Sequence, residues 1–206
     1  LVPPTDLTAI GMEALSRPID ASAGLVAAWV GQHSWYQVPG HALNEVLLDP
    51  IAEALPDEMM QSCNDFPSMD GVSTLEEIFQ PSLLELAATG SLAGHEPWAC
   101  YLGMADLHTT AIPRSVDPPV LVVVSGADEL VVASTVRESV PGLCEDGYRI
   151  DYLECEGASH TEGAVNSLPY QIEWVADRLA GTPLPEAETC VVDAPIDCEQ
   201  FLTTER

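Results

Sequence analysis

The run Val120–Val124 constrains the fold more than any other segment of this sequence. It consists of Val, Leu, Val, Val and Val, and lacks the alternation of apolar and polar positions that a half-exposed strand shows. A continuous apolar run rich in β-branched residues is typical of a strand buried on both faces of a parallel sheet. Parallel neighbours need a crossover connection, so we expect a helix and then a second strand downstream.

The residues that follow supply these elements. Leu130–Val140 has the spacing of a helix that ends at Pro141-Gly142, and Tyr148–Glu154 is a second strand with partial alternation. Val165–Ala180 is the last long helix, and Gly181 ends it. Strand, helix, strand and helix in this order predict an α/β fold, namely the end of a doubly wound sheet.

The stretch before this region has a different character. Short helical patterns alternate with prolines from about residue 17 to residue 112, and no β-rich run occurs there. The expected helical segments start after Pro18 and continue with Ala42–Leu48, Ile51–Leu55, Thr74–Phe79 and Leu83–Ala88. We interpret this stretch as a helical insertion or cap.

The charge balance excludes several classes of partner. Asp and Glu number 33, the basic residues number 6 and are all Arg, and the formal net charge is -27. Nucleic-acid binding and basic membrane anchoring both need clustered cations, so we expect neither. No apolar run approaches the roughly 20 residues of a membrane-spanning helix, so we expect no transmembrane segment.

Six scattered cysteines indicate disulfides and an extracellular location. No pair has the C-x-x-C spacing of a zinc or redox site, and an even set of this kind is typical of secreted proteins. Six cysteines allow about 15 pairings. We expect Cys63 to pair with Cys100, and the later four to pair among themselves, these being Cys144, Cys155, Cys190 and Cys198.

The remaining histidines show no metal-ligand pattern. None has an i, i+4 partner suited to a metal, and we interpret them as structural or surface residues, namely His33, His41, His95 and His108. We therefore predict no metal site.

Candidate catalytic residues lie in the two loops that follow the two predicted strands. Asp128 lies in the first loop and His160 in the second. Ligands of an open parallel sheet bind beyond the carboxyl ends of its strands, where these loops meet. A carboxylate that accepts the Nδ1 proton of a histidine fixes the ring's tautomer and leaves Nε2 free to take a proton from a nucleophile.

Each residue also has a simpler interpretation. Asp128 can cap the following helix, and His160 can be a turn residue. Glu129 and Glu162 adjoin the pair. They either alter the electrostatic field at Asp128 and His160 or are solvated turn carboxylates. The occurrence of Asp128 and His160 in this order, each after a buried strand, favours the acid–base pair of a hydrolase.

At these residues the sequence resembles a known family. Gly126–Val131 is similar to the acid loop, and Gly157–His160 to the histidine loop, of the α/β-hydrolases, which place Ser, Asp and His in that chain order. Leu143–Tyr152 and Trp174–Pro183 are similar to the secretory lipase family. Pro3–Leu7 resembles the strand end that follows that family's nucleophile helix.

The resemblance implies the C-terminal part of an α/β-hydrolase, with parallel strands, flanking helices and a helical cap or lid insertion. Residues 1–16 would be a remnant of the hydrolase core, and residues 17–112 the cap or lid. Residues 113–183 would form the C-terminal core with the acid and histidine loops, and residues 184–206 a tail.

The chain lacks the serine motif of this family. The strings nearest to Gly-x-Ser-x-Gly are Gly71–Leu75 and Gly157–Thr161, and neither ends in Gly. We therefore expect the nucleophile and the oxyanion hole upstream of Leu1.

The resemblance implies a secreted lipase or carboxylesterase that hydrolyses carboxylic esters with a Ser-Asp-His triad. His160 would be the general base and then the general acid, and Asp128 would orient it. No metal or organic cofactor is implied. We expect a neutral ester or lipid substrate, transient contact of the cap with a lipid interface, and no activity from this fragment alone. Two alternatives stay open: a serine peptidase of the same fold, and a non-catalytic hydrolase-like binding protein.

Overall fold

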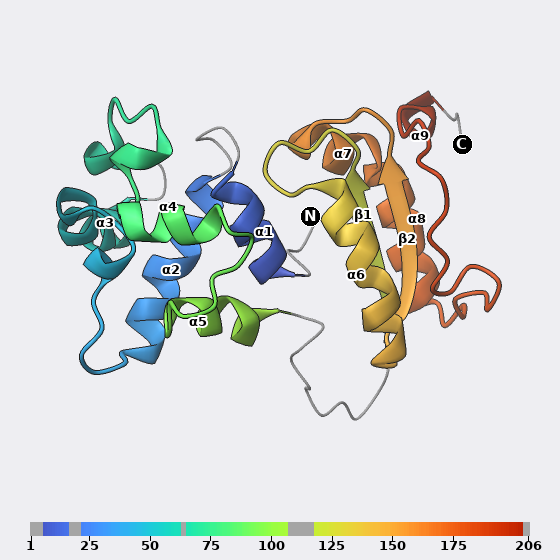
Figure 1. Cartoon of the computed structure of the whole chain (residues 1–206). Coiled ribbons are helices and arrows are strands. Elements are labelled where there is room, and N and C mark those ends of the chain that lie inside the picture. The colour runs from blue at the N-terminus through green and yellow to red at the C-terminus, as the bar shows by residue number, and fades with distance from the viewer. Residues whose placement is uncertain (1–5, 17–21, 63–64, 107–117, 204–206) are drawn as a thin grey trace. The chain divides into compact units, whose positions relative to one another are not determined.

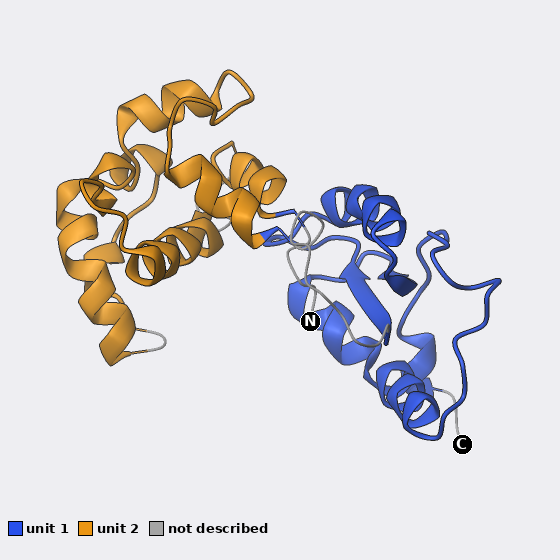
Figure 2. Ribbon diagram, turned by 90° about the horizontal axis from the view of Figure 1, so that it is seen from below, with its two compact units in different colours: residues 1–6, 106–206 blue, residues 7–105 orange. Residues whose placement is uncertain are grey.

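The computed structural model describes residues 6–16, 22–62, 65–106 and 118–203. The chain divides into two compact units, which Figure 2 colours separately. One, the sheet unit, comprises Leu1–Asp6 and Asp106–Arg206, and the other, the helical unit, comprises Leu7–Ala105. Of the strand end predicted at Pro3–Leu7, residues 3–5 lie outside the described residues.

The sheet unit contains the strand–helix–strand arrangement that the sequence predicted. Strand β1 (Pro119–Ser125) pairs in parallel with β2 (Arg149–Cys155), in a register that aligns Pro119 with Arg149 and Ser125 with Cys155. Helix α6 (Ala133–Glu145) connects them (Figure 1). A helix that links two parallel neighbours makes this an α/β unit.

Both faces of the sheet are covered. Val122, Val124 and Ile150 pack with the buried face of α6. On the opposite face Val123 and Leu153 pack with Tyr170 of helix α8 (Leu168–Leu179). This two-sided burial explains why Val120–Val124 is apolar without interruption.

Helix boundaries differ from the predictions. Helix α6 begins at Ala133, not at Leu130, and it continues through Pro141 to Glu145. Val140 and Leu143, which flank Pro141 in this helix, are both buried, so their packing outweighs the hydrogen bond that proline cannot donate.

The predicted last helix is divided in two. It consists of α7 (His160–Asn166) and α8, with the break at Ser167, because Pro169 occupies the first turn of α8. The prediction that Gly181 ends the helix is confirmed, since Gly181 has a φ of 83°.

Two disulfides hold the C-terminal tail along the outer edge of β2. They join Cys144 to Cys190 and Cys155 to Cys198, which confirms that the later four cysteines pair among themselves. The tail also pairs with β2 through its backbone, because the Ile196 amide donates to Glu154 O (2.9 Å). A short helix, α9 (Gln200–Thr203), follows. Cys100 is a free cysteine in the structure, so the prediction that it pairs with Cys63 is wrong; Cys63 itself lies outside the described residues.

The helical unit is built from short helices, as predicted, but the segments predicted at Ala42–Leu48 and Thr74–Phe79 form 3₁₀ turns and not α-helices. The α-helices are α1 (Leu7–Ala14), α2 (Ser22–Tyr36), α3 (Asp49–Gln61), α4 (Pro81–Ala87) and α5 (Trp98–Ala105). Between the described helices lie the 3₁₀ turns η2 (Leu43–Glu45), η3 (Pro67–Met69) and η4 (Leu75–Glu77).

Aromatic side chains form the centre of this unit. Trp29 packs edge-on against both Phe79 and Trp98, and all three are buried. Among the described residues of the unit the extended structure amounts to one isolated bridge, between Leu47 and Phe79. None of the helices that the structure describes is both long enough and apolar enough to cross a membrane.

Candidate functional site

The structure brings the two predicted site residues together. Nδ1 of His160 lies 2.9 Å from Oδ2 and 3.0 Å from Oδ1 of Asp128. Asp128 follows β1, and His160 is the first residue of α7. The Asp128 side chain is 0% exposed and the His160 side chain 28% exposed, so the imidazole connects a buried carboxylate with the surface.

Parallel pairing of the strands positions the two loops. The Gly126 amide donates to Cys155 O (2.8 Å), and the Ala127 amide donates to Ala158 O (2.9 Å). Any Cβ at position 126 would lie 3.0 Å from Cys155 O, so glycine permits this close approach. The loops therefore form one hydrogen-bonded edge that carries both side chains.

Asp128 has a second role that the sequence analysis gave as an alternative. Its Oδ1 accepts hydrogen bonds from the amides of Leu130 (2.9 Å) and Val131 (2.8 Å). These bonds shape the loop before α6 and explain why the helix begins late, at Ala133. The carboxylate is thus oriented by two backbone donors as well as by His160.

The first turn of α7 fixes the backbone of His160. Ser159 and Glu162 form a capping box, in which the Ser159 amide (3.0 Å) and hydroxyl (2.7 Å) donate to Glu162 Oε2. These hydrogen bonds lower the pKa of Glu162. Glu129 Oε2 accepts from the His160 amide (3.1 Å). His160 therefore starts a capped helix and is not a simple turn residue.

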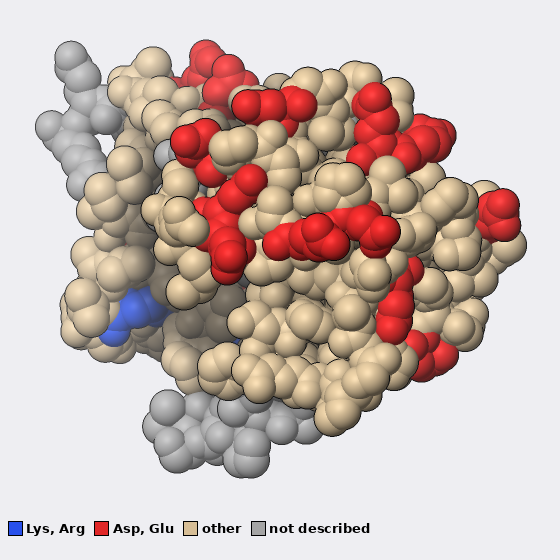
Figure 3. Space-filling view, turned by 90° about the vertical axis from the view of Figure 1, so that its left-hand side faces the viewer, with Lys and Arg blue, Asp and Glu red and all other residues tan. Residues whose placement is uncertain are grey.

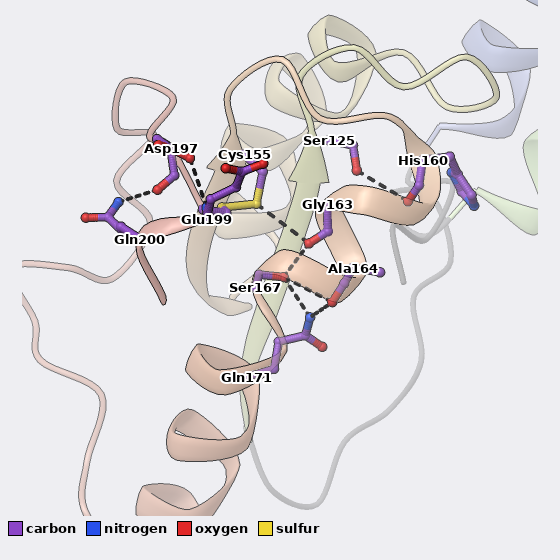
Figure 4. The surroundings of a disulfide bond; sticks show 11 residues. Ser125, Cys155, His160, Gly163, Ala164, Ser167, Gln171, Asp197, Glu199 and Gln200 are labelled. Carbon is purple, nitrogen blue, oxygen red and sulfur yellow. Dashed lines mark hydrogen bonds between the residues drawn. A yellow bond between two sulfur atoms is a disulfide. The ribbon is translucent and has the colours of Figure 1, made fainter. Parts of the chain in front are cut away.

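The contact between Gly163 and Ser125 was not predicted from the sequence. A Cβ on Gly163 would collide with Ser125 Oγ and lie 2.9 Å from Ser125 Cβ, so α7 packs this closely on β1 only with glycine there. Ser125 Oγ donates to the backbone oxygen of His160 (3.5 Å), and Ser167 Oγ donates to Gly163 O (2.6 Å) (Figure 4). The only signal in the sequence was the glycine in the first turns of a helix.

The other ring nitrogen of His160 is available for chemistry. No described residue forms a hydrogen bond with Nε2, and Ser125 contacts the backbone of His160 and not its ring. Within the described ranges no group of three His, Cys, Asp or Glu residues is placed to hold a metal ion.

A neighbouring buried carboxylate provides a contrast. Glu154, at the end of β2, accepts hydrogen bonds from Arg137 Nε (3.0 Å) and from the Tyr152 hydroxyl (2.6 Å). Burial and the hydrogen bond to Glu154 raise the pKa of Tyr152. This network contains no imidazole that could exchange a proton with a nucleophile, so we interpret it as structural.

These features define a class: an α/β protein with a carboxylate–imidazole pair at the carboxyl ends of parallel strands. Residues 96–187 match the model of the secretory lipase family, and the resemblance predicted from the sequence is confirmed. The matched segment includes both strands and both loops of the site. No curated protein and no solved structure matches the chain significantly.

The family match suggests a lipase-type function and ester hydrolase activity in general, with a lipid substrate. Together with the two disulfides it fits an extracellular protein.

Proposed function

We propose that this chain supplies the acid and the base of a serine-type carboxylic ester hydrolase, a lipase or carboxylesterase with a Ser-Asp-His triad. The observation that carries the proposal is the contact between His160 Nδ1 and the buried Asp128 carboxylate. In triads of this kind the carboxylate keeps the imidazole in the tautomer whose Nε2 can accept a proton.

The proposed mechanism uses both nitrogens of His160. Nε2 takes the proton of the serine hydroxyl as the serine oxygen attacks the ester carbonyl, and the imidazole then gives that proton to the departing alkoxide. Water then attacks the acyl-serine ester while Nε2 takes one of its protons, and the imidazolium gives that proton to the departing serine oxygen. Asp128 stays ionised and stabilises the imidazolium that forms twice in the cycle.

We propose that the nucleophilic serine and the oxyanion hole come from a segment outside these 206 residues. One support is that the described residues place no serine hydroxyl at His160 Nε2. Another is that the described part of the sheet has only β1 and β2. A third is the row of exposed apolar side chains on α8, consisting of Leu168, Ile172, Val175 and Leu179, since such patches mark surfaces that pack against further polypeptide.

The same proposal assigns roles to the remaining segments. Residues 113–183 would be the C-terminal part of an α/β-hydrolase core, residues 17–112 its cap or lid, and residues 184–206 a tail held by disulfides. Figure 3 shows Asp and Glu spread over one face, with far fewer Arg. A surface this acidic repels anions, which favours a neutral ester as substrate.

Activity assays test the proposal. The 206-residue chain alone should not hydrolyse nitrophenyl esters, whereas a polypeptide that adds the serine-bearing segment should. In that longer polypeptide, His160→Ala should lower kcat by several orders of magnitude. His95→Ala, in the helical unit, is the control for loss of a histidine. Ester turnover by the chain alone, or a near-normal rate for His160→Ala, would contradict the proposal.

A further inference from the structure

The helical unit contains a cavity of about 680 Å³, widely open to solvent, that the proposed chemistry does not use. Its walls come from the C-terminal half of α2, the loop that follows, η2 and α3. Val30, Val38, Leu43 and Ala52 give these walls an apolar lining. Small-molecule sites have volumes of about 300–1,000 Å³, so the cavity has the size of a ligand pocket.

His41 in the wall of this cavity forms a second imidazole–carboxylate pair. Its Nδ1 lies 3.0 Å from Glu45 Oε2, which also accepts a hydrogen bond from Trp98 Nε1 (2.8 Å). Burial raises the pKa of Glu45, but hydrogen bonds from His41, Trp98 and the Ala42 amide outweigh that effect and hold the pKa below its usual value. The ionised carboxylate accepts the Nδ1 proton, so Nε2 is left as a hydrogen-bond acceptor.

Neighbouring residues hold the backbone of His41 in place without using its Nε2. His33 stacks on Trp98 with ring centroids 5.7 Å apart, and its Nε2 donates to the backbone oxygen of His41 (3.2 Å). No described residue forms a hydrogen bond with Nε2 of His41. An acceptor that is fixed in advance costs little to order when a ligand binds.

The charges around the cavity select the ligand. No Lys or Arg occurs among the described residues that line it, Glu53 is in its wall, and the whole chain carries a formal charge of -27. An anionic head group would therefore be repelled. A free acceptor in an apolar pocket instead favours a neutral group that donates a hydrogen bond.

We propose that this cavity binds a neutral amphiphilic alcohol, whose hydroxyl donates to His41 Nε2 and whose apolar chain contacts Val30, Leu43 and Ala52. The site goes beyond the proposed ester hydrolysis and stands without it, because it is formed entirely by residues of the helical unit.

Calorimetric titration of the 206-residue chain tests the site. We expect 1-decanol to bind saturably with one molecule per chain, and decanoate at pH 8 to bind at least tenfold more weakly. Ala52→Phe, which fills the cavity, should abolish decanol binding. Met60→Ser, on the same helix but 87% exposed and outside the cavity, should not change it. Absence of saturable decanol binding, or tighter binding of decanoate, would overturn the proposal.

A second comparison tests the role of His41 and does not depend on Ala52→Phe folding. His41→Asn keeps an amide donor near Glu45 but removes the Nε2 acceptor. It should weaken decanol binding about three- to tenfold, the effect of one hydrogen bond. The methyl ether of decanol has no hydroxyl proton, so its affinity should be equal in the wild type and in His41→Asn. An equal loss for both ligands, or no loss for decanol, would refute the hydrogen bond.

Discussion

The two units each contain a histidine whose Nδ1 faces a carboxylate, but they hold the pair differently. Asp128 and His160 lie 32 residues apart, and parallel strands bring them together. His41 and Glu45 are four residues apart, at the 3₁₀ turn η2. The Asp128 side chain is 0% exposed, and that of Glu45 is 35% exposed.

This difference in burial separates two kinds of chemistry. A buried carboxylate can stabilise the imidazolium that forms while a general base transfers a proton. A carboxylate shared with Trp98 and partly screened by water mainly fixes a tautomer, as a binding site requires. The same pair of residue types therefore serves proton transfer in one proposal and ligand recognition in the other.

The largest expected effect concerns the carboxylate of the sheet unit. In a polypeptide that includes the serine-bearing segment, Asp128→Asn should lower kcat about 10⁴-fold, because an amide cannot stabilise the imidazolium and favours the wrong tautomer. Steady-state kinetics with a neutral nitrophenyl ester measure this. Glu186→Gln makes the same chemical change at a side chain that is 90% exposed, and should leave kcat unchanged. A loss below tenfold for Asp128→Asn would remove Asp128 from the triad.

The next largest effect concerns a disulfide that links the C-terminal tail to the sheet unit. The disulfide between Cys155 and Cys198 closes a loop with a sequence separation of 43. Cys155→Ala combined with Cys198→Ala should lower the free energy of unfolding of this unit by about 2–5 kcal/mol. Urea denaturation followed at Trp174, with the other tryptophans replaced by Phe, measures it. Cys100→Ala, which changes an exposed cysteine of the helical unit, is the control. An unchanged midpoint in the double variant would show that the tail contributes no stability.

The two parallel strands and the contact between Asp128 and His160 could be predicted because their signals are local. The apolar run Val120–Val124 identifies a two-sided strand, and Asp128 and His160 each follow a predicted strand. Helix boundaries could not be predicted in the same way. The start of α6 depends on amides that bind Asp128, and its passage through Pro141 depends on burial of residues on both sides.

Contacts between elements could not be predicted from the sequence either. The approach of Gly163 to Ser125 depends on how α7 packs on β1, which no local pattern encodes. His41 and Glu45 have an i, i+4 spacing in the sequence, but this spacing does not by itself indicate a hydrogen bond between them. The interpretation of His41 as a structural or surface residue therefore did not include its contact with Glu45.

A smaller effect tests how closely α7, the helix that begins at His160, packs on β1. Gly163→Ala should lower the free energy of unfolding by about 1–3 kcal/mol, since the added Cβ overlaps Ser125. Gly142→Ala in α6 is the matched control, because nothing lies within 4 Å of its added Cβ. It should be neutral or stabilising by up to about 1 kcal/mol. Ser125→Gly should partly rescue Gly163→Ala, and equal destabilisation by both Ala variants would refute the close contact.

The smallest effect concerns Glu45 in the helical unit. Its folded pKa lies below the ordinary value of 4.5, so its contribution to stability is present above pH 4.5 and is lost as the pH falls through the lower folded value. The contribution should be at most about 1 kcal/mol, because the side chain is 35% exposed and screened by water. Urea denaturation between pH 7 and pH 3, followed at Trp98, should show this loss in the wild type.

Glu45→Gln isolates that contribution, because glutamine does not titrate. The variant should be less stable than the wild type at pH 7, and the difference should shrink as the pH falls below 4.5. Glu76→Gln, which removes a carboxyl group at η4, should leave the slope of stability against pH close to that of the wild type. If Glu45→Gln and the wild type differ by the same amount at every pH, the Glu45 carboxylate is not what fixes His41. The tautomer that leaves His41 Nε2 as an acceptor in the cavity would then have no explanation.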